Sequence, residues 1–269
     1  MKKTNENEIK KPVYVVVSDK GGTGKSTIAG HCLPVVLHLK YPNKKIKVYE
    51  LDNSNNTNYI NSTLVNFKSL KNKDEESKQA IYNIDFDALT STDTISIIDV
   101  AGSDETYEVL ERLQSVGLNG LTYLVPMGKD LEHLLNSKNT IKGIKKCDPT
   151  GSINLILNKC ASLDPHAIKK DFISIFGDES IGIPPAEDLD YDDLFFIKDC
   201  NDYSILKSFH QLTLLDAYIY GKDLLDNLVK YKMEWQKDRD LYIINLQKVE
   251  FARRIVTTVE ELKPLIKAL

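Results

Sequence analysis

The sequence predicts an α/β fold, a doubly wound parallel sheet followed by a helical C-terminal extension. Apolar segments of strand length alternate with segments of helical pattern at least five times along the chain. The strand segments are apolar at nearly every position, as is typical of strands buried on both faces of a parallel sheet. Beyond about residue 222 the pattern is helical only. We therefore expect one domain over residues 1–221 and a helical extension over residues 222–269.

The first strand, turn and helix are expected near the N-terminus. Residues 13–17 (VYVVV) form an apolar, β-branched run, and a glycine-rich turn at 21–24 separates this run from a helix over 25–39. Pro34 lies inside that helix. We expect it to bend or shorten the helix, because proline lacks an N–H and its ring clashes with the preceding turn.

Two further strands are expected in the first half of the chain. One covers 46–51, and the other covers 94–100 (TISIIDV) and precedes a helix over 105–116. Residues 57–93 between these strands are polar, with a charge-rich helix or loop around 71–78. The pattern does not fix the elements of this segment.

The second half of the chain continues the alternation of strands and helices. In order, we expect a strand over 121–126, a helix over 131–145, a strand over 153–158, a helix over 165–176, a short strand over 180–183 that ends at two prolines, a mainly helical region over 190–230, and one or two long amphipathic helices over 231–263.

The composition is that of a folded protein with a sizeable core and a nearly balanced charge. Of 269 residues 42% are hydrophobic, and 35 basic residues against 39 acidic ones give a net charge of −4. This balance excludes a globally basic nucleic-acid coat and a disordered acidic tail. No run approaches the roughly 18 apolar residues of a membrane span, and residues 1–11 lack the apolar stretch of a signal peptide. We therefore expect a cytoplasmic protein.

The four cysteines are scattered, and none belongs to a C-x-x-C pair. In a cytoplasmic chain this predicts small buried hydrophobic side chains rather than a metal or redox site. The residues are Cys32, Cys147, Cys160 and Cys200.

The turn between the first strand and the first helix is the most informative segment. Glycines allow successive backbone N–H groups to curl around phosphate oxygens, and the following helix presents its positive end. Lys25 can reach the β- and γ-phosphates of a nucleotide, and the Ser26 hydroxyl can hold Mg²⁺. The expected fold is therefore of the P-loop NTPase type. Its nucleotide-binding residues are Lys20, Gly21, Gly22, Thr23, Gly24, Lys25, Ser26 and Thr27.

This turn resembles the deviant Walker A motif of the ParA/MinD ATPases. A plain P-loop has glycine where this chain has Asp19, and the turn carries a second lysine, Lys20. The resemblance implies an ATPase in which Lys20 crosses a dimer interface to the nucleotide of the partner. It also implies that Asp52, at the end of the second strand, sits near the attacking water. Here Asn53-Ser54 stands where the family has Pro-Gln.

Three later positions in the sequence extend the resemblance over roughly residues 12–220. Asp99 ends a buried strand, as the Walker B carboxylate does, and can hold Mg²⁺ through water. Asn158 stands where the family has an amide that reads adenine, and Ile183 and Pro184 match its adenine-flanking turn. ATP and Mg²⁺ are thus the implied ligands.

Two lengths bear on the branch of the family. Asp52 and Asp99 are 47 residues apart. Many partition ATPases have an extra strand and helix in this interval, so the chain resembles the compact ParF-type branch. About 12 residues precede the first strand, which is too few for a helix-turn-helix domain, so operator binding is not expected.

The resemblance implies three partners, which are a second copy of the chain, a protein that stimulates hydrolysis, and non-specific DNA. The charges favour DNA only weakly, because acidic residues dilute the one interleaved basic cluster, and a solvated helix face explains it better. Its residues are Lys230, Lys232, Lys237 and Arg239. A membrane anchor is not expected, since residues 249–269 lack a distinctly basic polar face.

We therefore expect a slow, Mg²⁺-dependent ATP hydrolase that dimerises on ATP and acts as a nucleotide switch in plasmid or DNA partition or positioning. The alternative is a nucleotide-switched accessory protein of a conjugation or secretion assembly, with little hydrolysis and no DNA contact. A metabolic synthetase of related fold is disfavoured, because Lys20 would have no purpose in a monomeric site. An iron–sulfur scaffold is disfavoured by the absence of paired cysteines.

Overall fold

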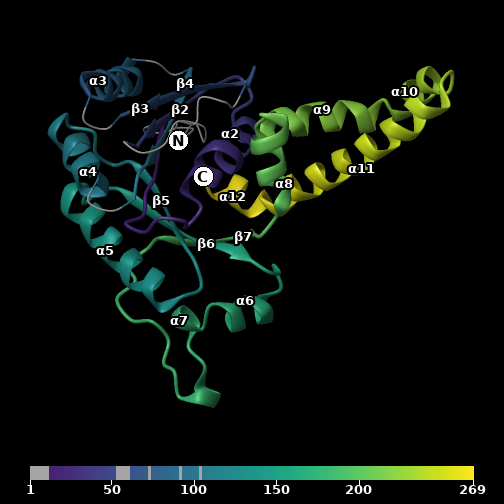
Figure 1. Cartoon of the computed structure of the whole chain (residues 1–269). Coiled ribbons are helices and arrows are strands. Elements are labelled where there is room, and N and C mark those ends of the chain that lie inside the picture. Colours follow the sequence, from purple (N-terminus) through teal and green to yellow (C-terminus); the bar gives the residue numbers. More distant parts are fainter. Residues whose placement is uncertain (1–11, 53–60, 72–73, 91–92, 103–104) are drawn as a thin grey trace, which may run out of the picture.

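The computed structural model describes residues 12–52, 61–71, 74–90, 93–102 and 105–269. Within them, seven strands form one parallel sheet in the order β3-β2-β4-β1-β5-β6-β7 (Figure 1). The predicted fold class is confirmed. The strands are β1 (Val13–Val16), β2 (Lys45–Leu51), β3 (Val65–Leu70), β4 (Thr94–Val100), β5 (Thr122–Met127), β6 (Ser152–Cys160) and β7 (Asp193–Lys198).

Helices cover both faces of the sheet, and each face has its own apolar core. Side chains alternate along a strand, so Val13 and Val15 of β1 face one core while Tyr14 and Val16 face the other. The first core is covered by α3 (Glu75–Thr90), α4 (Glu105–Ser115), α5 (Leu131–Cys147), α6 (Pro165–Asp171) and α7 (Ile173–Phe176). The second is covered by η1 (Ile28–Cys32), α2 (Leu33–Lys40), α8 (Asn201–Ile205), η3 (Leu206–His210), α9 (Leu214–Asp226), α11 (Arg239–Glu261) and α12 (Lys263–Ala268). The short α1 (Lys25–Thr27) leads into η1 and has no buried residue.

The strand order reverses at β1, which lies between β4 and β5. The helix that follows β1 covers one face of the sheet, whereas α4 and α5, which follow β4 and β5, cover the other. In open parallel sheets such a reversal leaves a crevice outside the carboxyl ends of the strands, where ligands bind. The turn after β1 lies at this crevice.

The helix after β1 passes through Pro34 without being shortened, so that part of the prediction is wrong. Helical backbone continues from Lys25 to Lys40. Immediately before the proline it widens into the π turn η1, in which the Leu33 N–H bonds to the Ile28 carbonyl. A wider turn relieves the clash between a proline ring and the preceding carbonyls.

The segment left open by the sequence contains a strand and a helix. β3 pairs with β2 at the edge of the sheet, and α3 buries Ala80, Ile81 and Ile84 against it. A strand and a helix therefore do fit between Asp52 and Asp99. The branch of the family stays a prediction. Residues 53–60, including Asn53 and Ser54, lie outside the described residues.

The last strand of the sheet is not the one predicted. Residues 179–181 form a 3₁₀ turn, and Ile183 makes only an isolated antiparallel bridge with Asp178. The strand is β7, inside a region expected to be mainly helical. Two adjacent prolines cannot donate ladder hydrogen bonds, whereas Leu194-Phe195-Phe196-Ile197 has the β-propensity of a strand.

The C-terminal helices both pack on the domain and project from it. The end of α11 and α12 bury Ile255, Val259 and Leu265 in the second core. In Figure 1 the far half of α9, α10 (Leu228–Trp235) and the first half of α11 project as a helical hairpin, here called the arm. The expected boundary between the domain and the C-terminal extension, at residue 221, falls inside α9. The division of the chain into these two parts remains a prediction. None of the helices in the described ranges is long and apolar enough to cross a bilayer.

Candidate nucleotide site

The turn after β1 has the backbone that a phosphate cradle requires. Gly22 and Gly24 have φ of 76° and 95°, a region that glycine tolerates and other residues rarely adopt. At Gly24 a Cβ would also lie 2.0 Å from Nδ2 of Asn158. That amide donates to the Thr23 carbonyl at 2.7 Å. The structure therefore brings predicted residues 135 positions apart into contact.

Lys25, the first residue of α1, folds its ammonium back under the turn. Nζ donates to the carbonyls of Lys20 at 3.0 Å and Ser18 at 3.2 Å. Burial lowers the pKa of Lys25, and the carboxylates of Asp99 and Asp52 oppose that shift. Two neutral carbonyls are weak partners for a half-buried cation, so phosphate oxygens would bind this ammonium more strongly.

Asp99 and Ser26 form the predicted metal side of the site. Asp99 ends β4 and is 5% exposed, and the Ser26 hydroxyl bonds to its carboxylate. Its Oδ1 is buried and has no hydrogen-bond partner within the described part of the chain. A buried carboxylate oxygen without a partner is costly. A hydroxyl and an open carboxylate are ligands that suit Mg²⁺, so these residues fit the implied metal.

Asp99 is also held close to a second buried carboxylate. Glu50 on β2 is directly opposite Asp99 in the strand register and is 6% exposed. The pKa of Asp99 is raised to about 7, mainly by burial and also by Glu50 and Asp52, while Ser26 and Lys25 oppose the shift. A divalent cation would relieve this accumulation of negative charge.

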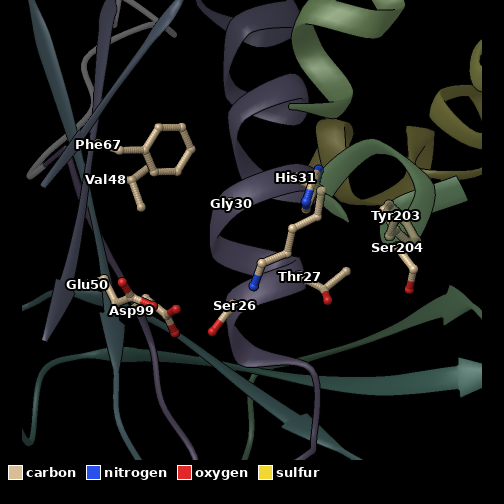
Figure 2. Close-up of a pocket in the computed structure, with 11 residues that line it drawn as sticks. Ser26, Thr27, Gly30, His31, Val48, Glu50, Phe67, Asp99, Tyr203 and Ser204 are labelled. Carbon is tan, nitrogen blue, oxygen red and sulfur yellow. The ribbon is translucent and has the colours of Figure 1, made fainter. Parts of the chain in front are cut away.

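A small cavity of about 70 Å³ opens beside these carboxylates. Figure 2 shows Glu50 and Asp99 pointing across it toward Ser26, with Tyr203 and Ser204 on the far side. His31 Nδ1 accepts from the Leu214 N–H at 3.2 Å, while its buried Nε2 has no partner among the described residues. Sequence reasoning missed the side of the cavity formed by residues 203–207, because nothing in the motif links these residues to the P-loop.

Lys20 points away from the chain's own phosphate turn. Its ammonium forms an ion pair with Glu132 in the first turn of α5. The side chain is 36% exposed. Asp19, where a plain P-loop has glycine, accepts from the Tyr107 hydroxyl at 2.6 Å, and its N–H bonds to Thr140 at 3.1 Å. These contacts fix the turn against α4 and α5.

Asp52 lies at the expected end of β2. Its N–H bonds to the Leu70 carbonyl at 3.2 Å, and its charge acts on both Lys25 and Asp99. The carboxylate is therefore near the phosphate turn and the metal side of the site. Its role in orienting water remains a prediction.

Ile183 and Pro184 are not brought to the site, and the prediction that they flank adenine is corrected. They precede β7, and the loop leading into it bonds to the amino end of β6 through the Asp192 N–H and the Ile153 carbonyl. The phosphate turn is at the opposite, carboxyl edge of the sheet. In Figure 1 the segment between α7 and β7, which contains both residues, projects beyond α7.

Residues after β7 reach the carboxyl edge instead. Lys198 pairs with Cys160, two residues beyond Asn158, and the Asp199 N–H bonds to the Cys160 carbonyl at 2.8 Å. Lys159, with φ of 60°, donates from Nζ to the Gly22 carbonyl at 3.1 Å. A correct position for β7 would have placed the residues that follow it at the carboxyl edge of the sheet.

Without metal, the Asp99→Asn variant is expected to be more stable than the wild type, and the difference in the free energy of unfolding should grow as pH rises. The pKa of Asp99 is about 7 in the folded chain against 3.8 as its ordinary value, so folding takes up a proton between these values. Stability therefore falls as pH rises from about 4 to about 7, and the amide removes this loss. The gain should reach roughly 2–4 kcal/mol at about pH 8 and vanish near pH 4.

Urea denaturation at several pH values measures this effect, with exposed Glu76→Gln as the control. Stabilisation by Mg²⁺ in the presence of ATP should disappear in Asp99→Asn. An unchanged pH dependence would mean that Asp99 is already ionised at low pH.

No family model matches the sequence, and no curated protein matches it. Several solved structures resemble the chain, and among them are two plasmid partition proteins from Borrelia burgdorferi. The one bound to AMPPNP is 14% identical with a TM-score of 0.46, over 74% of this chain and 90% of that one. The other is 14% identical with a TM-score of 0.45, over 74% and 94%. Both similarities are weak, and neither assigns a function to this chain.

Proposed function

We propose that the protein is a Mg²⁺-dependent ATPase that dimerises on ATP and acts as a nucleotide switch in plasmid or DNA partition or positioning. The observation that carries this proposal is the turn of residues 18–27. It combines two glycines at positive φ with a half-buried lysine whose hydrogen bonds within the described chain go to backbone carbonyls. Such a turn at a helix N-terminus is suited to phosphate.

Hydrolysis is proposed from the charges around the turn. When bound, Mg²⁺ supplies positive charge to the phosphates, and Ser26 and Asp99 are the residues that would hold it. Lys25 stabilises negative charge that develops on the phosphate oxygens. The half-buried Asp52 can accept a hydrogen bond from water and orient it. The adenine ring of the nucleotide is expected to lie between Asn158 and the loop after β7.

Dimerisation is proposed from Lys20. Its partner Glu132 lies in the same chain, and the lysine is too exposed to be a core residue. An exposed ion pair contributes little stability, so Lys20 can exchange Glu132 for a phosphate of a second chain at little cost. A protein that stimulates turnover and non-specific DNA are the further partners that the sequence resemblance suggests.

The second candidate is a nucleotide-switched accessory protein with little hydrolysis and no DNA contact. One observation favours it, because the arm mixes basic and acidic side chains instead of presenting a basic face. Lys230 and Lys237, for example, share a groove with Asp226 and Glu234. ATP turnover measured with and without Mg²⁺, and then with added DNA, separates the candidates. Turnover raised by DNA supports the first, and ATP binding without turnover supports the second.

Asp52→Ala is expected to bind ATP normally and to lose turnover by about 100-fold or more. A group that orients the attacking water affects the transition state more than ground-state binding. Calorimetry measures the binding, and phosphate release measures the turnover, with Glu76→Ala as a surface control. Normal turnover in Asp52→Ala together with a loss in Glu50→Gln would assign the role to Glu50.

A further inference from the structure

The outer face of α3 carries an apolar stripe that the described parts of the chain leave exposed. Tyr82, Phe86 and Leu89 are 52%, 64% and 76% exposed. They are spaced i, i+4 and i+7 and therefore lie on one side of the helix. Single exposed apolar side chains are common, whereas an aligned set marks a contact surface.

The same helix is acidic. Residues 75–90 contain four carboxylates and one lysine. Glu75 pairs with Lys78 and Asp87 with Lys47, which leaves Glu76 and Asp85 without an ion pair among the described residues. Asp85 stands three residues after Tyr82 and four before Leu89, so it borders the stripe. A helix with this stripe and this charge fits an apolar groove with a basic rim.

The arm carries such a groove at the opposite end of the molecule (Figure 1). It lies between α10 and the start of α11 and has a volume of about 460 Å³. Val229 and Met233, 69% and 60% exposed, supply its apolar surface. Lys232 and Arg239 line it, and no carboxylate does. The neighbouring groove on the other side of Val229 has two lysines and two carboxylates, so it offers an acidic helix no net attraction.

We infer that α3 of a second copy of this chain docks in the arm groove. Helices dock in apolar grooves through anchors at i, i+4 and i+7, which is the spacing of the stripe. Lys232 and Arg239 at the groove are then placed to pair with Asp85, which borders the stripe. One chain cannot make this contact with itself, because α3 and the arm lie at opposite ends (Figure 1). It involves no residue of the phosphate turn and is independent of the proposed ATPase.

The contact is heterologous, so each docked pair leaves one α3 and one arm groove available. Such interfaces continue into open assemblies unless they close into a ring. One helix in one groove buries less than a standard stable interface, so the affinity should be modest, with Kd on the order of 10–100 μM.

Sedimentation velocity of the full chain without nucleotide tests this inference. The wild type should sediment faster as concentration rises, without stopping at a dimer. A groove variant (Lys232→Glu with Arg239→Glu) and a stripe variant (Phe86→Ser) should each self-associate at least about tenfold more weakly. All three side chains are on the surface, and circular dichroism checks the folding. Ile181→Ser, at a residue 62% exposed elsewhere, is the matched control and should behave as wild type.

Mixing the two variants is the decisive step. The groove variant keeps its α3, and the stripe variant keeps its groove, so an equimolar mixture should form a 1:1 dimer and grow no further. A mixture that stays monomeric, or variants that associate as wild type does, would overturn the inference. A wild type that remains monomeric at every concentration also overturns it, and would leave the groove to an acidic helix of another protein.

Discussion

Lys25→Ala is expected to abolish ATP binding, with a loss of affinity of about 100-fold or more. The ammonium is half-buried and already aimed into the turn, where it bonds to the Lys20 and Ser18 carbonyls. Charge-assisted hydrogen bonds to phosphate contribute about 1.5–3 kcal/mol each, and two of them account for this factor. Calorimetric titration with ATP and Mg²⁺ measures the change.

A matched variant separates this effect from a general loss of positive charge. Lys129→Ala removes a half-exposed ammonium whose partner is Asp171, outside the phosphate turn, and should bind ATP as the wild type does. The alanine at position 25 should leave the fold intact, because Lys25 is not part of either apolar core. Unchanged ATP affinity in Lys25→Ala would contradict the assignment of the turn.

Lys20→Ala is expected to retain ATP binding and to lose both ATP-dependent dimerisation and turnover. Two chains with a net charge of −4 each have no general electrostatic reason to associate, and bound ATP adds negative charge. A lysine that reaches the phosphates of the other chain would reverse this repulsion through charge-assisted bonds. ADP lacks the γ-phosphate, so the dimer should open after hydrolysis.

A mixture of two inactive variants shows whether Lys20 acts on the partner's nucleotide. Lys25→Ala chains keep Lys20, and Lys20→Ala chains keep the ATP site, so one complete site can form in each mixed dimer. Some turnover should therefore return on mixing. Normal dimerisation of Lys20→Ala alone would make the lysine only a surface residue of the turn.

The parts of the fold that sequence reasoning predicted are those with a strong local signal. The apolar runs that became β1 and β4 lie within one residue of their predicted ends. β3 was missed because the edge strand VNFKSL is half polar and partly exposed, so it lacks the apolar run that marked the central strands. The prediction misplaces β7, because the short Ile-Gly-Ile run before two prolines has the apolar pattern of a strand.

The site was predicted to the extent that contiguous residues define it. The phosphate turn is a local motif, and Asp99 and Asn158 follow from buried strands that end at the same edge of the sheet. The Lys20–Glu132 ion pair and the side of the cavity at Tyr203 and Ser204 depend on how distant segments pack. A single sequence contains no signal for such pairings. The same reason explains the error at Ile183, since the side of the sheet that a loop reaches depends on which strand it follows.

The proposed dimerisation on ATP is tested most directly by measuring the mass of the protein with an ATP analogue, with ADP and without nucleotide. Light scattering should be performed on the Phe86→Ser chain, in which the proposed arm contact is removed, at a concentration of a few micromolar. With Mg²⁺ and a slowly hydrolysed ATP analogue, the mass should double from that of the 30.5 kDa chain, and with ADP or no nucleotide it should not. A mass that is the same in all three conditions would contradict a switch that dimerises on ATP.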